Sequence, residues 1–228
     1  MEMEAARSIL LILIVVVLIV YIAGFVIPRG PPETNTSSVL STVEIRDYQG
    51  QKLDSVTDFR ENSIKGPQHI NITTYQLAVG GLVDRPLNLT YGEVLAYPHY
   101  EKVVTLHCVE GWDATVLWDG VRVIDLLNEA GVRPGANTVI FYAYDGYSTS
   151  LPLDFVKNNN ILLASGMNNV TLPVDRGFPF QLVAEDKWGY KWIKWVTKIE
   201  LSDDPGYRGY WEQRGYSLNG NLSESFFS

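Results

Sequence analysis

The chain has 228 residues, of which 46% are hydrophobic and 12% aromatic, and this is enough for one medium-sized domain with a packed core. Its formal net charge is −8 and its sequence contains no basic cluster, which excludes a nucleic-acid partner because phosphate binding needs a concentrated basic face. The single cysteine, Cys108, excludes an intrachain disulfide.

An uninterrupted apolar stretch occupies residues 9–27, after a short N-terminal flank at residues 1–8. At about 1.5 Å per residue, a helix of this length matches the roughly 30 Å hydrocarbon core of a bilayer. The sequence after it, Val26-Ile27-Pro28-Arg29, does not resemble the small-residue cleavage site of a signal peptide. The stretch therefore predicts an uncleaved transmembrane anchor.

A polar tether rich in Pro, Ser and Thr follows at residues 28–42, and the remaining domain is expected at residues 43–228. Arg7 and Arg29 flank the anchor on opposite sides, so positive charge does not decide its orientation. Five N-x-S/T sequons follow the anchor, at Asn35, Asn71, Asn88, Asn169 and Asn221. Together with the tether they favour an extracytoplasmic position for the domain.

The first part of the domain mixes extended chain with short elements. Residues 43–65 are polar with scattered apolar side chains, which predicts an extended segment. Tyr75–Val83 begins with alternating apolar and polar residues and predicts a strand. Thr90 and Glu93 have the spacing of a capping box, which predicts a short helix that ends at Pro98.

The second part predicts more strands than helices. Val103–Cys108 alternates and predicts a strand, and Val121–Ala130 has the apolar spacing of a helix, with Gly131 as its stop. Thr138–Tyr144 is β-branched and aromatic, which is typical of a strand. Further short elements are expected as a helical turn at 152–157 and strands at 161–164, 180–184 and 195–201. The fold class is therefore α+β, mostly β, around one core.

Cys108 has three possible uses, namely packing, reactivity and metal ligation. A lone cysteine among apolar residues is most often a small buried hydrophobe, but strand alternation would place the carboxylate of Glu110 on the same face. His69, His99 and His107 are scattered, and no spacing indicates a Cys–His pair or a protein-only zinc or iron–sulfur site. The remaining possibility for ligation is that Cys108 binds a metal whose other ligands come from an organic cofactor.

The block HCVEGW at residues 107–112, followed by WDGV at 118–121, resembles the cofactor motif of the sulfite-oxidase family of molybdopterin enzymes. The resemblance is greatest to the branch that contains the periplasmic methionine sulfoxide reductase catalytic subunit. Further blocks match in the family's order, namely YQL at 75–77, DGYST at 145–149, DRGFPF at 175–180, WGYK at 188–191 and GYWE at 209–212. The resemblance covers roughly Phe59–Ser217. It implies the sulfite-oxidase catalytic-domain fold, as a single domain behind the N-terminal transmembrane helix.

The resemblance also implies a cofactor, which is molybdopterin with molybdenum or, as an alternative, tungsten. Cys108 would supply a thiolate to the metal, and the pterin would supply two dithiolene sulfurs, a soft ligand set that suits such a metal. The residues implied in cofactor binding are Asn62, Arg176, Gly189, Tyr190 and Lys191. Of these, Gly189–Lys191 matches the segment that holds the phosphate end, and Gln181 stands where many members have an arginine.

Family members that oxidise sulfite place arginines just after the cysteine, whereas Val109–Trp118 contains Glu110, Asp113 and no basic residue. A carboxylate there would repel an anion. We therefore expect two-electron oxygen-atom transfer on a neutral S-oxide or N-oxide, small or protein-bound, with Glu110 as a catalytic residue beside the metal. Trp112 and Trp118 are expected either to wall the pocket or to pack in the core.

The sequence shows no haem-binding pattern and no second metal motif, so the electrons must come from another protein. By analogy we expect a membrane haem or quinol partner, and we expect the chain itself to be a monomer. Two alternatives stay open. One is a non-catalytic binding or scaffold domain of the same fold without cofactor, and the other is a sulfite-oxidising enzyme.

Overall fold

The computed structural model describes residues 44–227. The transmembrane anchor predicted at residues 9–27 and the tether predicted at 28–42 lie outside the described residues. The described residues fall within one compact unit, Leu40–Ser228. None of the helices in residues 44–227 is long and apolar enough to cross a membrane.

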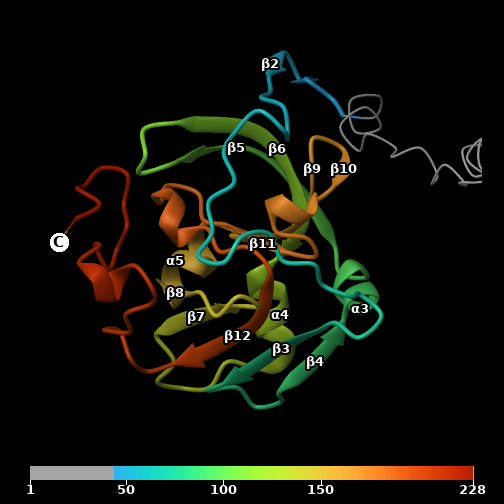
Figure 1. Cartoon of the computed structure of the whole chain (residues 1–228). Coiled ribbons are helices and arrows are strands. Elements are labelled where there is room, and N and C mark those ends of the chain that lie inside the picture. The colour runs from blue at the N-terminus through green and yellow to red at the C-terminus, as the bar shows by residue number, and fades with distance from the viewer. Residues whose placement is uncertain (1–43, 228) are drawn as a thin grey trace, which may run out of the picture. The chain divides into compact units, whose positions relative to one another are not determined.

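Two five-stranded sheets form the body of the domain (Figure 1). The first sheet has the order β10-β9-β6-β5, with β11 also paired to β9, and all its pairings are antiparallel. Its strands are β5 (His99–His107), β6 (Asp113–Arg122), β9 (Leu162–Met167), β10 (Val170–Thr171) and β11 (Gln181–Val183). A small separate hairpin, β1 (Asp47–Tyr48) with β2 (Gln51–Lys52), precedes the sheets.

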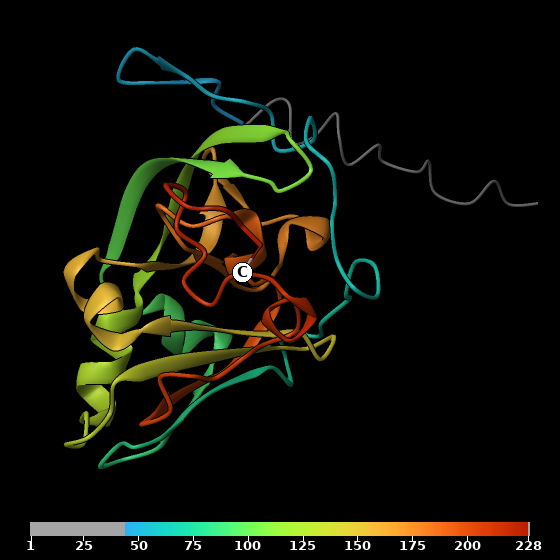
Figure 2. The same ribbon diagram turned by 90° about the vertical axis from the view of Figure 1, so that its left-hand side faces the viewer.

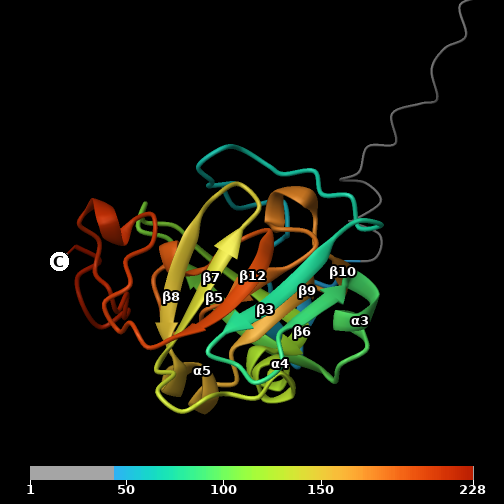
Figure 3. The same cartoon turned by 90° about the horizontal axis from the view of Figure 1, so that it is seen from below.

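The second sheet has the order β4-β3-β12-β7-β8, and Figure 3 shows it with β12 at its centre. Its strands are β3 (Gln76–Gly81), β4 (Leu87–Thr90), β7 (Thr138–Ala143), β8 (Ser148–Pro152) and β12 (Val196–Ser202). β12 runs parallel to β3 and antiparallel to β7, so the last strand of the chain is inserted between earlier ones. The second sheet is therefore complete only once β12, which follows all strands of the first sheet in the sequence, has been inserted.

The three α-helices within residues 44–227 are short and lie beside the second sheet (Figure 3). They are α3 (Tyr91–Leu95), α4 (Val123–Ala130) and α5 (Leu153–Asn158). The capping box predicted for Thr90 and Glu93 is confirmed, since each side chain accepts from the other's backbone N–H. The predicted stop at Gly131 is also confirmed, and its φ of 76° is one that glycine adopts without strain. The α+β, mostly β class is confirmed.

One hydrophobic core fills the space between the sheets, and Trp118 is part of it. Its side chain is fully buried, its ring lies 5.5 Å from that of Trp192, and its Nε1 donates to the carbonyl of Val104 at 3.2 Å. A buried indole that satisfies its N–H in this way contributes to packing. The prediction that Trp118 packs in the core is therefore confirmed, and the alternative prediction that it walls the pocket is wrong.

Candidate active site

A cavity of about 560 Å³ lies in the domain, with Cys108 in its wall. Its lining comes from an irregular segment between Phe59 and Gly66, from the turn after β5, from the turn between β7 and β8, from the chain around residues 189–195, and from Trp211 and Tyr216. We call residues 59–66 the strap; it belongs to the chain that descends after β2 in Figure 2. The volume suits an organic cofactor.

A tight turn holds Cys108 immediately after β5. The backbone N–H of Cys108 donates to the carbonyl of Trp112 at 2.9 Å, and the N–H of Gly111 donates to the carbonyl of Cys108 at 3.0 Å. Gly111 has a φ of 84°, which glycine adopts without strain. Glu110 was expected to share a strand face with Cys108. This prediction is wrong, because β5 ends at His107 and neither residue lies in the strand. The turn nevertheless brings Glu110 and Cys108 into the same cavity wall.

The thiol of Cys108 is 8% exposed and lies beside the strap. Burial raises its pKa, the hydrogen bond from the Glu110 backbone lowers it, and the Glu110 carboxylate raises it again. The Asn62 amide nitrogen, 3.5 Å from Sγ, lowers this pKa to a smaller extent. A thiol that is harder to ionise is a poor free nucleophile, whereas a bound metal deprotonates it outright. Of the three uses open to Cys108, this environment disfavours free reactivity and is compatible with packing and with ligation.

Arg176 is 4% exposed and holds the strap in place. Its Nε donates to the carbonyl of Val56 at 2.7 Å, and its two terminal nitrogens donate to the carbonyls of Phe59 and Arg60 at 2.5 and 3.1 Å. The guanidinium also lies 3.9 Å from the centre of the Phe59 ring. Arg176 lines the cavity as predicted, and three of its five donors fix the backbone that carries Asn62.

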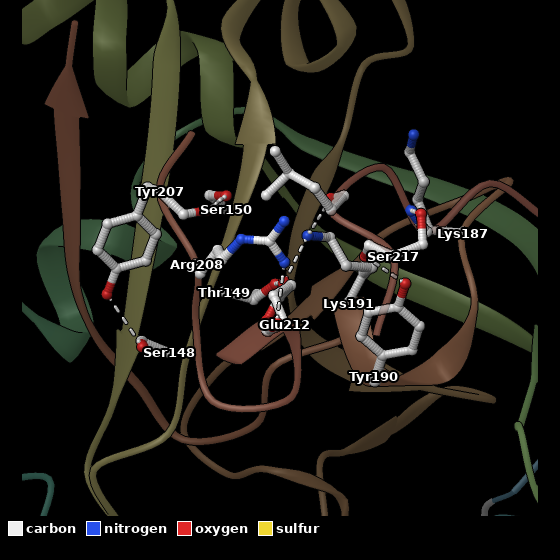
Figure 4. A network of polar contacts seen from close by, with 12 residues as sticks. Ser148, Thr149, Ser150, Lys187, Tyr190, Lys191, Tyr207, Arg208, Glu212 and Ser217 are labelled. Carbon is white, nitrogen blue, oxygen red and sulfur yellow. Dashed lines mark hydrogen bonds and ion pairs between the residues drawn. The ribbon is translucent and has the colours of Figure 1, made fainter. Parts of the chain in front are cut away.

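Lys191 lies in the 3₁₀ turn η2 (Gly189–Lys191), but its side chain points into the interior rather than into the cavity (Figure 4). Its Nζ pairs with Glu212 Oε1 at 2.6 Å and donates to the carbonyl of Leu218 at 3.0 Å. The same Glu212 oxygen accepts from the Thr149 hydroxyl at 2.7 Å. Of the predicted phosphate-binding triplet, the structure thus places Gly189 and Tyr190 in the cavity wall and Lys191 behind it.

Lys194, which the sequence did not single out, supplies a cation to the cavity instead. Its Nζ pairs with Glu61 of the strap at 2.5 Å and donates to the carbonyl of Asp175 at 3.2 Å. Burial lowers its pKa and the hydrogen bond to Glu61 opposes that effect. Lys194 lies three residues after the WGYK block at 188–191, which ends at Lys191.

Arg60 was also missed, because it lies far from Cys108 in the sequence. Its guanidinium approaches the Glu110 carboxylate to 3.6 Å at the mouth of the cavity, and both side chains are exposed to solvent. A smaller hollow of about 360 Å³ adjoins this mouth and is lined by Asp58–Arg60 and Glu110–Asp113. The mouth therefore carries a cation as well as the carboxylate that the sequence predicted.

The cavity fits an organic cofactor that brings its own metal ligands. No group of three or more His, Cys, Asp or Glu side chains within residues 44–227 is arranged to hold a metal ion. A metal at Cys108 would therefore take its remaining ligands from the cofactor. At Gly189 an added Cβ would lie 3.2 Å from the His107 carbonyl oxygen and 3.4 Å from Cys108 Cα, so glycine lets η2 approach the cysteine turn closely.

Residues 64–211 match the model of the family described as the oxidoreductase molybdopterin binding domain. The chain belongs to this family. The resemblance of its sequence blocks to the sulfite-oxidase-like molybdopterin oxidoreductases is thereby confirmed, as are the expectations of an enzyme and of a molybdopterin–molybdenum cofactor.

Two curated relatives illustrate the breadth of the family. The uncharacterized oxidoreductase YuiH of Bacillus subtilis is 36% identical over 68% of this chain and 78% of its own length. The protein-methionine-sulfoxide reductase catalytic subunit MsrP of Gluconobacter oxydans is 33% identical over 57% of this chain. This chain spans 47% of the length of that reductase and 78% of that of YuiH.

The solved structure of the sulfane dehydrogenase SoxCD from Paracoccus pantotrophus has a similar fold. It superposes with a TM-score of 0.61 over 78% of this chain and 54% of the other, at 22% sequence identity. At this identity the likeness concerns the fold, and it confirms the sulfite-oxidase-type catalytic domain that the sequence blocks implied.

Proposed function

We propose that this member of the family transfers an oxygen atom from a neutral S-oxide or N-oxide, with Cys108 as the protein ligand of its metal. The observation that supports this most directly is the single thiol in the cavity wall, beside a mouth where Arg60 is compensated by Glu110. Such a mouth has no net positive charge to hold a dianion, so sulfite oxidation is the less favoured reaction. The match to MsrP adds support for a sulfoxide substrate.

The described residues suggest how the cofactor would be held. Cys108 would bind the metal, and the Asn62 amide would stay within hydrogen-bonding range of its sulfur. Gly189 and Tyr190 offer backbone at the cavity wall, and Lys194 offers the ammonium that an anionic phosphate end requires. The metal, when bound, would supply the two-electron redox chemistry that oxygen-atom transfer requires.

The protein's own part in the reaction is to orient the substrate and deliver protons. Reduction of an S-oxide to a sulfide consumes two protons and two electrons and releases one water molecule. Glu110 lies two residues from Cys108 and lines both the cavity and the outer hollow, so its carboxylate connects the metal side with solvent. Trp112 and Phe59, whose rings lie 5.8 Å apart, form an apolar wall for the substrate's organic group.

We further propose that the two electrons come from a membrane haem or quinol partner. The apolar stretch at residues 9–27 and the sequons support an anchored, extracytoplasmic domain that would meet such a partner at the membrane. The protein would act as a monomer tethered by one helix.

Metal and pterin analysis tests the proposal. The wild-type protein and Cys108→Ser are purified from a host that makes the cofactor, and molybdenum, tungsten and pterin are measured per chain. We expect close to one metal in the wild type, loss of oxide reduction in Cys108→Ser, and an unchanged melting temperature within a few degrees.

Turnover of a dialkyl sulfoxide, an aromatic N-oxide and sulfite is then compared with artificial electron donors and acceptors. A wild-type protein without metal would favour the scaffold alternative. Faster sulfite oxidation than oxide reduction would overturn the proposed reaction while leaving the cofactor assignment intact.

A further inference from the structure

Three of the described residues that line the cavity are cations, namely Arg60, Arg176 and Lys194. Arg176 donates hydrogen bonds to carbonyls of the strap and of the residues before it. Lys194 is mostly buried and donates to a carboxylate and a carbonyl. Arg60 differs, because its side chain is 76% exposed and its guanidinium is paired with Glu110 at 3.6 Å. Arg60 is thus the cation that can move toward a substrate.

The backbone of both residues is held, that of Arg60 by Arg176, but the Glu110 side chain is shorter and less exposed than that of Arg60. Glu110 belongs to the five-residue turn that two backbone hydrogen bonds close between Cys108 and Trp112. Arg60 is a long side chain on irregular chain, and its planar guanidinium is suited to bidentate contact with oxyanions. The carboxylate therefore decides where the guanidinium lies.

We propose that Glu110 makes the enzyme selective for neutral oxides by holding Arg60, so that the mouth offers no free cation to an anionic substrate. This inference rests on the proposed function and assigns a specificity-determining pair to the same site. Without Glu110, the guanidinium of Arg60 would contact a bound oxyanion directly. The attraction between two opposite unit charges in contact is modest in water and larger where the cavity excludes water.

The chain offers a matched control for the loss of such a pair. Arg85 and Glu129 form an ion pair at 3.2 Å with similar exposure, 66% and 42%, and neither lines the cavity. Glu129→Gln removes the carboxylate partner of an exposed arginine as Glu110→Gln does, but at another place, and Arg85 keeps its hydrogen bond to the Glu129 carbonyl. It separates binding at the mouth from a general gain of positive charge.

The test measures the affinity of the cofactor-loaded protein for sulfate, an unreactive oxyanion, by isothermal titration calorimetry at low ionic strength. The proteins compared are the wild type, Glu110→Gln, Arg60→Gln, the double variant and Glu129→Gln. We expect Glu110→Gln to bind sulfate about ten-fold more tightly than the wild type. In the Arg60→Gln background the same substitution should change the affinity by less than about three-fold, and Glu129→Gln should match the wild type.

An equal gain with and without Arg60 would overturn the proposal, because Glu110 would then act only through its own charge. An unchanged affinity in Glu110→Gln, or an equal gain in Glu129→Gln, would overturn it as well. Sulfate binding needs no turnover, so a wild type that fails to reduce any oxide contradicts the proposed function without deciding this test.

Discussion

Two lysines of one short segment serve different ends in this domain. Lys191 is fully buried and paired with Glu212 of the C-terminal part, whereas Lys194 lines the cavity and is paired with Glu61 of the strap. They lie three residues apart, and both make short contacts to a carboxylate. The difference shows that the segment that supplies the partner, rather than the lysine itself, decides between a structural and a cofactor-facing role.

The Lys191 pair fastens chain that forms one wall of the cavity. Glu212 lies between Trp211 and Tyr216, which both line the cavity, and its second carboxylate oxygen is buried without a hydrogen-bond partner in the described part of the chain. Both charged groups are removed from water, so each depends on the other. The pair contributes little net stability compared with apolar groups, but losing one member is costly.

Breaking this pair is expected to have the largest effect. Lys191→Met would leave the Glu212 charge buried and unpaired, and the free energy of unfolding should fall by about 3–5 kcal/mol. Urea unfolding followed by tryptophan fluorescence measures the loss. The double variant Lys191→Met/Glu212→Leu removes both charges and should recover most of it. A single variant within 1 kcal/mol of the wild type would show that the pair is not as isolated from water as its burial indicates.

Changing the cavity-facing lysine should instead weaken cofactor retention. Lys194→Gln removes the ammonium beside the proposed phosphate end, and we expect about ten-fold weaker retention of the pterin, because hydrogen bonds to charged groups contribute about 1.5–3 kcal/mol. Pterin fluorescence after extensive gel filtration measures the retained fraction. Glu61→Gln keeps the cation and serves as the control, with retention equal to the wild type or better. Equal retention in Lys194→Gln and the wild type would contradict this role.

Local sequence signals predicted the parts of the fold that local chemistry decides. The capping box at Thr90, the helix stop at Gly131 and the β-branched run at Thr138 depend on neighbours within a few residues, and all three were confirmed. The ordered family blocks around Cys108 predicted the cofactor and the general fold. These signals lie within a few residues of one another or are shared across a family, so they can be recognised without knowledge of the tertiary structure.

The parts that failed depend on long-range contacts. Arg60 reaches Glu110 only because the strap crosses the cavity, and Lys191 turns inward because Glu212, far along the chain, is there to receive it. Trp118 packs in the core because it lies within β6, a strand paired on both sides, with its side chain fully buried. Composition and spacing cannot report which face of a turn meets a distant segment.

A third lysine of the same region, Lys187, sharpens the comparison because it is buried and forms no ion pair with any other residue of 44–227. It donates to the side-chain amide oxygen of Asn221, and its Nζ lies 4.1 Å from the centre of the Phe155 ring. Burial lowers its pKa to about 8, and the nearby Lys191 charge adds to the shift. Keeping it charged therefore costs stability below pH 8, where it is protonated in both the folded and the unfolded chain.

Above pH 8 the folded chain releases this proton before the unfolded chain, whose lysine titrates near 10.5, so stability rises with pH in that window. We expect Lys187 to contribute a gain of about 1–2 kcal/mol between pH 7.5 and 9.5, a window in which the onset of tyrosine ionisation affects every variant alike. Urea unfolding across this window compares the wild type with Lys187→Met, using the exposed Lys157→Met as the control. The rise should be smaller in Lys187→Met, by the stated amount, while Lys157→Met follows the wild type. Burial also lowers the pKa values of Lys191 and Lys194, so part of the rise in stability with pH should remain in every variant. Identical stability profiles in Lys187→Met and the wild type would contradict the contribution assigned to Lys187.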